Sequence, residues 1–144
     1  MEMRKIEIGS DHAGFDLKEA LKVILESEGN FVMDHGTYNN ASADYPDYAH
    51  KTAEAVLANK DMGILICGSA NGVCISANKH NGIRAALCWK LEIAGLARKH
   101  NNANIICIPA RYVTEKEAWE MVRVFMETEF EGGRHETRVN KIDC

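Results

Sequence analysis

The stretch Ile64–Gly72 places a cysteine where an apolar run ends and a loop of small residues begins. Cys67 is followed by Gly68-Ser69-Ala70-Asn71-Gly72, and the segment Val73–Lys79 can form a helix. A thiolate at a strand end beside unpaired backbone N–H groups suits a base that works next to a developing oxyanion. The alternative is that Cys67 is a packed strand residue, because free cysteine is among the most buried residue types. Spacing alone leaves both interpretations open.

Two other groups of residues could bind an anion. Asp11-His12 is either a helix cap or a place where a histidine donates to an anion. Arg134 and Arg138 belong to the densest basic cluster of the chain and share one face if this stretch is helical. They form either a solvated tail or a clamp for phosphate, which paired guanidinium groups bind well. The loop after Cys67 matches neither a P-loop nor a dinucleotide-binding Gly-x-Gly-x-x-Gly.

The composition narrows the class of protein. The chain has 144 residues, 46% apolar and 26% charged, as expected for one globular domain with a real core. The net charge of −4 argues against general binding to nucleic acid or to an anionic membrane. No apolar stretch approaches the roughly 20 residues of a membrane span, and the N-terminus lacks the features of a secretory signal. The five cysteines show no Cys-x-x-Cys spacing, so we expect a reducing, cytoplasmic setting.

Short apolar runs alternate with segments whose apolar residues recur at helical spacing. This β-α order predicts a three-layer α/β/α Rossmann-like sandwich around a five-stranded parallel sheet. The predicted strands are Ile6–Gly9, Phe31–Asp34, Gly63–Cys67, Arg84–Cys88 and Asn104–Ile108. Helical patterns cover Leu17–Leu25, Ala49–Leu57, Val73–Lys79, Ile93–Ala97 and a last segment that begins at the capping box of Thr114 and Glu117. We expect Gly132-Gly133 to end this last helix, and residues 130–144 to form a C-terminal tail of the single domain 1–144.

Functional residues of such sheets gather at the carboxyl ends of the strands, near a switch in strand order. The strand boundaries of this chain carry Ser10–Gly14, Asp44–Pro46, Cys67–Gly72, Arg98–Asn102 and Pro109–Arg111. His100 has a functional interpretation only if its segment faces Cys67; otherwise it is part of a solvated helix end. The remaining histidines and cysteines checked for metal ligation show no ligand spacing and are interpreted as structural or surface residues: His35, His50, His80, Cys74 and Cys88.

Together these motifs resemble the type B ribose-5-phosphate isomerases, a family that includes galactose-6-phosphate isomerase subunits. The resemblance covers nearly the whole chain in seven ordered blocks: Gly9-Ser10-Asp11-His12-Ala13-Gly14, Asp44-Tyr45-Pro46, Ile66-Cys67-Gly68-Ser69, Ile75-Ser76-Ala77-Asn78-Lys79, Gly82-Ile83-Arg84-Ala85, His100-Asn101 with Asn104, and Glu131-Gly132-Gly133-Arg134-His135 with Arg138. One branch of the family uses a Glu in the loop as its base. Val73 stands at that position here, so the chain resembles the cysteine branch.

The resemblance implies an aldose–ketose isomerase that interconverts ribose 5-phosphate and ribulose 5-phosphate through an enediolate, in the pentose phosphate pathway. It implies that Cys67 is the base, that Ser69 and the backbone of Gly68–Gly72 hold the enediolate oxygens, and that His100 assists ring opening. Asp11 and Asp44 are implied as helpers and Tyr45 and Asn101 as sugar contacts; the implied phosphate contacts are His12, Arg111, Arg134 and Arg138. The resemblance also implies a homodimer or a tetramer whose subunits share active sites through the tail, and no metal ion or organic cofactor.

Two departures from the family pattern keep alternatives open. Ala70 stands where glycine is usual, and a Cβ there costs about 1 kcal/mol or more if φ is positive. This motivates the alternative of a non-catalytic sugar-phosphate-binding subunit. The segment Trp89-Lys90-Leu91 and Pro109-Ala110 also differ from the usual pattern. The Trp89 segment motivates a second alternative, an isomerase of a hexose 6-phosphate such as galactose or allose 6-phosphate.

Overall fold

A parallel sheet of five strands forms the centre of the molecule. The computed structural model describes residues 3–144. The strands are β1 (Lys5–Ser10), β2 (Phe31–Asp34), β3 (Met62–Cys67), β4 (Ala85–Leu87) and β5 (Ile105–Pro109), in the spatial order β2-β1-β3-β5-β4. Every adjacent pair of strands is parallel. All five strands coincide with predicted strands to within one residue at either end.

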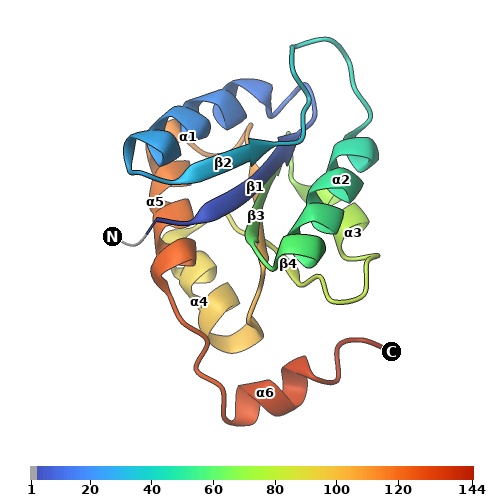
Figure 1. The fold of residues 1–144 in the computed structure, drawn as a ribbon, viewed down its shortest axis with the longest axis vertical. Helices are drawn as coiled ribbons and strands as arrows, with labels where there is room; N and C mark the ends of the chain where they lie inside the picture. Colours follow the sequence, from blue (N-terminus) through green and yellow to red (C-terminus); the bar gives the residue numbers. More distant parts are fainter. Residues whose placement is uncertain (1–2) are drawn as a thin grey trace.

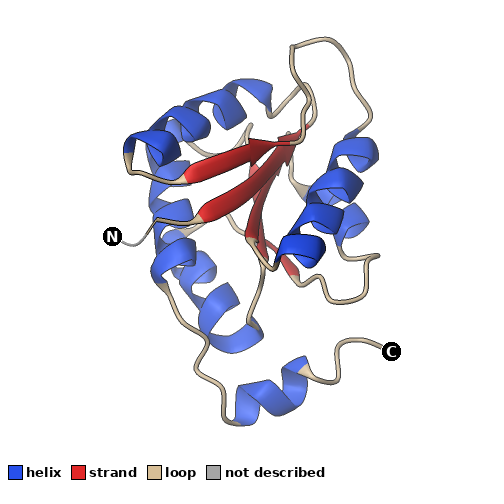
Figure 2. Ribbon diagram, in the orientation of Figure 1, coloured by secondary structure: helices blue, strands red, loops and turns tan. Residues whose placement is uncertain are grey.

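Helices cover both faces of this sheet (Figures 1 and 2). The helices are α1 (Phe15–Ser27), α2 (Tyr45–Asn59), α3 (Asn71–Ala77), α4 (Leu91–Asn101), α5 (Glu115–Glu127) and α6 (Arg134–Val139). One core cluster packs α1, α4 and α5 against the sheet, and the other packs α2 and α3 against its opposite face. The predicted three-layer sandwich is therefore confirmed.

The central strands are apolar on both faces because both faces are covered. Ile64, Leu65 and Ile66 of β3 are buried, with at most 2% of each residue exposed. In the sheet, β2 lies on one side of β1 and β3 lies on the other. The strand order therefore reverses between β1 and β3. The carboxyl ends of these two strands border the crevice in which doubly wound sheets bind ligands.

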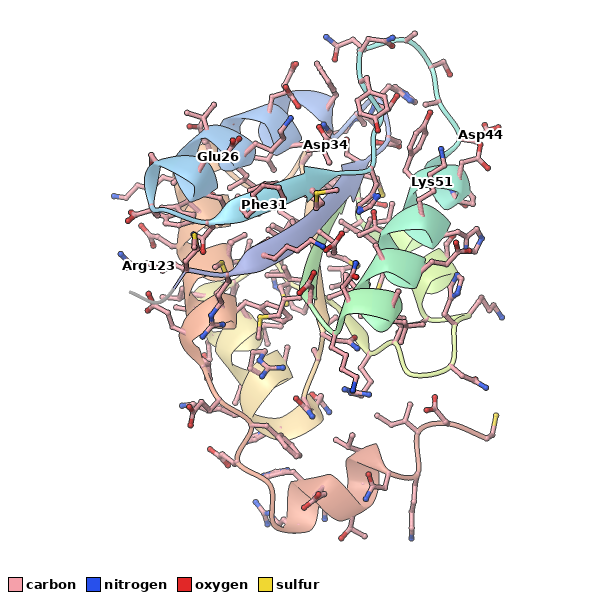
Figure 3. The ribbon with its side chains drawn as sticks, in the orientation of Figure 1. Glu26, Phe31, Asp34, Asp44, Lys51 and Arg123 are labelled. Carbon is pink, nitrogen blue, oxygen red and sulfur yellow. The ribbon has the colours of Figure 1, made fainter. Side chains whose placement is uncertain are left out.

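A buried lysine fixes α1 against the carboxyl end of β2. Lys18 is fully buried, and its Nζ lies 2.6 Å from Asp34 Oδ2 and 2.8 Å from Glu19 Oε2. Figure 3 shows Asp34 at the end of β2, beside α1. Burial raises the pKa of the Asp34 carboxyl, but hydrogen bonds from Lys18 and Lys22 outweigh it and hold the pKa below its ordinary value. The cluster therefore keeps β2 and its following loop in place at the edge that carries the site.

Several helix boundaries differ from the sequence-based expectation, and two of them bear on the site. Helix α3 begins at Asn71 rather than Val73, so Asn71 and Gly72 belong to its first turn and not to the loop. Helix α5 begins at the predicted capping box, in which the Thr114 side chain accepts from the Glu117 N–H, but it ends at Glu127. The expectation that Gly132-Gly133 ends that helix is therefore wrong. The two glycines directly precede α6 instead. Within residues 3–144, no helix combines the length and the apolar content that a membrane crossing needs.

Candidate active site

The loops after β3 and β5 lie side by side. The N–H of Ala110 donates to the carbonyl of Cys67 at 2.9 Å, and the N–H of Arg111 donates to that of Gly68 at 3.1 Å. A Cβ added at Gly68 would lie 3.2 Å from Arg111 Nη1, so the guanidinium group rests against the glycine backbone. The structure thus brings Cys67, Gly68 and Arg111 together, as the sequence-based site requires.

The loop after β1 packs onto the same edge. Its Asp11 N–H donates to the carbonyl of Ile66 at 3.3 Å. The Asp11 carboxylate accepts from the N–H of Gly14 at 3.1 Å, directly before α1, and is 7% exposed. A Cβ at Gly14 would meet the Ile66 carbonyl oxygen at 2.6 Å. Asp11 therefore holds the turn before α1 at the end of β3, but it is not the cap of the helix, because the N-cap residue is Gly14 and no side chain caps it.

His12 offers a single hydrogen-bond donor to a ligand. Its Nδ1 accepts from the N–H of Ala43 at 3.2 Å. Because Nδ1 is occupied as an acceptor, the neutral ring carries its proton on Nε2, and only that atom can donate. The same bond ties the loop that leads to Asp44 and Tyr45 onto the loop after β1. Asp44 is exposed directly before α2 (Figure 3).

The turn between β3 and α3 has a left-handed residue at its centre. Ala70 is fully buried with φ 66° and ψ −5°, a conformation that favours glycine. The turn directs the first N–H groups of α3 out of the helix, where they have no intrahelical acceptor. A Cβ on Gly72 would lie 2.6 Å from Tyr45 Cζ, so the tyrosine ring packs on the first turn of α3. Exposed Ser69 and these N–H groups form a polar rim beside Cys67.

Cys67 itself is the last residue of β3 and is 5% exposed. It packs in the same core cluster as Ala70 and Val73. Two other thiols lie deeper in the fold: burial raises the pKa of Cys88 to about 12 and the pKa of Cys107 well above its ordinary range. Those two thiols therefore stay protonated at neutral pH, whereas the position of Cys67 at the strand end places it beside the polar rim.

A second group of expected site residues lies at the opposite edge of the sheet. His100 and Asn101 end α4, directly before β5, and Arg134 and Arg138 are exposed on α6. In a parallel sheet, the residues that precede a strand lie at its amino end. Strand β3 has six residues, so the two edges are roughly 15–20 Å apart. The sequence-based grouping of His100 with the carboxyl-end residues of the same chain is therefore wrong.

Glu131 and His135 surround His100 at this amino edge. Glu131 Oε1 lies 3.9 Å from His100 Nε2 and 3.6 Å from His135 Nε2. The two imidazole rings stack with centroids 4.2 Å apart. Desolvation, together with the charges of His100 and Arg134, lowers the pKa of His135. Sequence analysis gave Glu131 and His135 no role of their own; their spacing of four residues, next to two arginines, was the available signal.

The carboxyl edge thus carries one half of the expected site and the amino edge carries the other. Asp11, His12, Asp44, Tyr45, Cys67–Gly72 and Arg111 belong to the first half. The second half consists of His100, Asn101, Arg134 and Arg138. A thiol base beside backbone donors can move a proton next to a carbonyl, and paired guanidinium groups can bind a phosphate. One chain alone does not bring these two capacities together.

Comparisons with known proteins agree with the fold and with the motifs. A family model described as Ribose/Galactose Isomerase matches residues 6–142. The chain is 46% identical to a probable ribose-5-phosphate isomerase B of Mycoplasma genitalium over 140 residues, which cover 95% of this chain and 92% of the relative. It is 42% identical to the ribose-5-phosphate isomerase B of Escherichia coli over 141 residues, 97% of this chain and 95% of the relative.

Solved structures give the same result. A ribose 5-phosphate isomerase of Thermotoga maritima superposes with a TM-score of 0.96 at 52% identity, covering 97% of each chain. The Mycoplasma genitalium ribose-5-phosphate isomerase B, solved with bound ribulose-5-phosphate, gives a TM-score of 0.92 at 44% identity and covers 99% of this chain and 95% of that one. The motifs, the fold and these relatives lead to one conclusion: the chain belongs to the ribose/galactose isomerase family.

Proposed function

We propose that this protein is an aldose–ketose isomerase that interconverts ribose 5-phosphate and ribulose 5-phosphate. The observation that carries the proposal is the position of Cys67 at the end of β3, beside Ser69 and the first turn of α3. The proposal is supported because proton transfer next to a carbonyl requires a base and oxyanion donors at one point, and a thiol and free N–H groups can serve in these roles. The relatives named as ribose-5-phosphate isomerases, one of them with the product bound, support the choice of substrate.

The reaction moves one proton between neighbouring carbons. The Cys67 thiolate takes the C2 proton of the open-chain aldose, and the electron pair of that C–H bond forms the C1–C2 double bond of an enediolate. The charge that develops on the oxygen is held by Ser69 and the N–H groups at the start of α3. The thiol then returns the proton to C1, and a proton passes from the C2 hydroxyl to the oxygen on C1. Base catalysis of this kind contributes roughly 10²–10⁴-fold, and the oxyanion donors several kcal/mol more.

The phosphate group supplies binding energy away from the reacting carbons. His12 Nε2–H and the Arg111 guanidinium lie at the carboxyl edge and can bind it from one side. Tyr45, packed on Gly72, and Asp44 are positioned to contact the sugar. Holding a flexible open-chain sugar at both ends keeps C1 and C2 in register with the base.

A second copy of the chain completes the site. His100, Asn101, Arg134 and Arg138 lie at the amino edge, too far from the Cys67 of their own chain to act on the same substrate. In a homodimer with two-fold symmetry, the amino edge of each subunit meets the carboxyl edge of the other, so the dimer contains two complete sites. His100 of the second subunit then assists opening of the furanose ring, and residues 130–144 pack on the neighbour. The five free cysteines support a cytoplasmic setting for this assembly.

Subunit complementation tests the reaction and the shared site together. Cys67→Ala and His100→Asn are each expected to lose at least about 100-fold in kcat on ribose 5-phosphate. When the two variants are co-refolded in equal amounts, half of the dimers are mixed, and each mixed dimer regains one intact site. Activity should therefore return to about one quarter of the wild-type value.

The matched control is Cys74→Ala, which removes a half-buried thiol that has no role in the proposed site. It should keep wild-type turnover, and its equal mixture with His100→Asn should show about one half of the wild-type activity, because half of the sites contain an intact His100. Absence of recovery in the Cys67→Ala and His100→Asn mixture would mean that both groups act within one chain. A wild-type protein that turns over no sugar phosphate would support the non-catalytic binding subunit instead.

A hollow beside the site favours one second candidate, an isomerase of a hexose 6-phosphate. This hollow has a volume of about 430 Å³ and is lined by Ser69, Asn71, Leu87, Trp89, Pro109 and Tyr112. It adjoins the loop after β3 and offers room for one more carbon unit. Comparison of kcat/KM for ribose, allose and galactose phosphates decides between the two, and a preference for the pentose by tenfold or more removes this candidate.

A further inference from the structure

Three side chains with metal-binding atoms converge at the amino edge of the sheet. His100 comes from the end of α4, Glu131 from the segment after α5 and His135 from α6. One ligand atom of each lies within 4.8 Å of the others. Glu131 Oε1 is the centre of the trio, at 3.6 Å from His135 Nε2 and 3.9 Å from His100 Nε2. No other such trio of His, Cys, Asp or Glu occurs within residues 3–144.

We propose that His100, Glu131 and His135 form a binding site for a divalent transition-metal ion, with Zn²⁺ as the reference ion. Two imidazole nitrogens and one carboxylate oxygen are a donor set that suits Zn²⁺ and leaves a fourth position for water or another ligand. Bond lengths of about 2.0–2.1 Å in a tetrahedral site place ligand atoms about 3.3 Å apart. The distances of 3.6 and 3.9 Å exceed this by about 0.3 and 0.6 Å, and the two imidazole nitrogens lie within 4.8 Å of each other.

The backbone positions the trio, and its side chains keep room to adjust. The N–H of Glu131 donates to the carbonyl of Lys99 at 3.1 Å, which ties the segment after α5 to the end of α4. The N–H of His135 donates to the carbonyl of Gly132 at 3.1 Å and fixes the start of α6. The Glu131 side chain is 50% exposed and that of His100 is 40% exposed. The stacked rings can therefore tilt to aim both Nε2 atoms at one ion.

The charges around the trio limit its affinity. Arg134 and Arg138 lie close enough to His135 to act on its charge, and Glu131 is the anion that opposes them. A bound cation is therefore stabilised mainly by its bonds to the three ligand atoms and not by the charges of the neighbouring side chains. Such a site releases its ion readily, which fits a site of reversible inhibition better than a permanent structural metal.

Metal binding has a functional consequence that rests on the proposed function. A metal bound to His100 Nε2 occupies the nitrogen lone pair that would accept a proton during ring opening, and it leaves no proton on that nitrogen to donate. Zn²⁺ is therefore expected to inhibit the isomerase reversibly, with activity restored by a chelator. The binding itself does not depend on the identity of the substrate, so it can be measured on its own.

Direct calorimetric titration with ZnSO₄ tests the site in a Cys67→Ala background, in which the proposed catalytic thiol cannot bind the metal. One ion per chain is expected. Both Glu131→Gln and His135→Gln should weaken binding by about tenfold or more, since each removes a ligand. Co²⁺ in place of Zn²⁺ should give the visible absorption bands of a four-coordinate ion, and these bands should vanish in His135→Gln.

Two matched controls keep the result specific. Glu129→Gln removes an exposed carboxylate two residues from Glu131. His80→Gln removes one partner of a separate pair, in which His50 Nδ1 lies 2.7 Å from His80 Nε2. Both should bind Zn²⁺ like the parent protein. Binding that persists in Glu131→Gln and His135→Gln, or that is lost in His80→Gln, would overturn the proposal. Metal binding by a wild-type protein that shows no isomerase activity would instead contradict the proposed function and leave the site intact.

Discussion

Ala70 is the residue at which the local backbone and the side chain disagree most clearly. Its φ of 66° lies in the left-handed region, where a non-glycine residue costs about 1–2 kcal/mol. Ala70→Gly relieves this strain, but it also removes a buried methyl group, worth about 0.8 kcal/mol, and adds about 0.5–1 kcal/mol of unfolded-state entropy. These contributions nearly cancel. We therefore expect Ala70→Gly to change the free energy of unfolding by less than about 0.5 kcal/mol in urea titration.

Two control substitutions separate these contributions. Ala53 is equally buried in the same core cluster but lies inside α2, so Ala53→Gly should cost about 2 kcal/mol. Lys60 has φ 55° and is exposed, so Lys60→Gly should stabilise the protein by about 0.5 kcal/mol. If Ala70→Gly costs as much as Ala53→Gly, the backbone at Ala70 is not strained, and the turn before α3 has another conformation in solution.

At the level of elements, sequence patterns predicted the buried strands of the sheet but did not predict α6, which lies outside it. Runs such as Ile64–Ile66 and Ile105–Ile108 are apolar because both faces of the sheet are covered, so they could be placed from sequence alone. Helix α6 could not be placed by periodicity, because none of its residues is buried. The sequence analysis placed Arg134 and Arg138 on one face only if this stretch was helical. The observed helix meets that condition.

The candidate site was predicted as a set of residues but not as an arrangement. Cys67, Gly68 and Arg111 follow strands, and parallel strands necessarily bring their carboxyl ends to one edge. His100 precedes a strand, so the same rule places it at the other edge. The hydrogen bonds that join Glu131 to Lys99 and the stacking of His135 on His100 depend on the path of the chain after α5. No local pattern specifies that path.

The glycine before α6 gives a prediction at this scale. Gly133 has φ 57° and ψ −131°, a conformation that is essentially restricted to glycine, and a Cβ there would meet no other atom within 4 Å. Gly133→Ala therefore introduces backbone strain of about 1–3 kcal/mol without a clash. Because α6 buries no residue, the strain is relieved by movement of α6, and Arg134 and Arg138 move with it. We expect KM for ribose 5-phosphate to rise about tenfold with little change in Tm.

Gly29→Ala is the matched control for this prediction. Gly29 has φ 90°, also in open space, but it lies after α1 and far along the chain from the arginines. Its substitution should lower Tm slightly and leave KM unchanged. An unchanged KM in Gly133→Ala would mean that α6 does not position the phosphate contacts.

For the whole molecule, stability near neutral pH depends on a carboxyl pair at the amino end of the sheet. Glu7 on β1 is 1% exposed, and its Oε1 lies 2.7 Å from His35 Nε2. Glu7 Oε2 and Asp61 Oδ2 are both buried, and neither has a hydrogen-bond donor among residues 3–144. A proton on Asp61 would satisfy both oxygens. Burial first, and then the hydrogen bond and charge of Glu7, raise the pKa of Asp61 to about 6, although Lys5 opposes the shift.

This raised pKa determines the direction of the pH dependence. The unfolded chain ionises Asp61 near pH 3.9, whereas the folded protein retains the proton up to about pH 6. The contribution of Asp61 to stability is therefore fully present below about pH 4 and is lost as the pH rises through 6. We expect the free energy of unfolding to fall by on the order of 1 kcal/mol between pH 5 and pH 8. Urea titrations at closely spaced pH values measure this fall.

Asp61→Asn tests whether this one group is responsible, because an amide can donate to Glu7 at every pH. The variant should lose most of the fall between pH 5 and pH 8 and should be more stable than the wild type at pH 8. Asp47→Asn, which changes an exposed carboxylate in the first turn of α2, should keep the wild-type slope. A wild-type protein whose stability rises from pH 5 to pH 8 would show that Asp61 is ionised throughout, so that Lys5 and not the shared proton dominates at this end of the sheet.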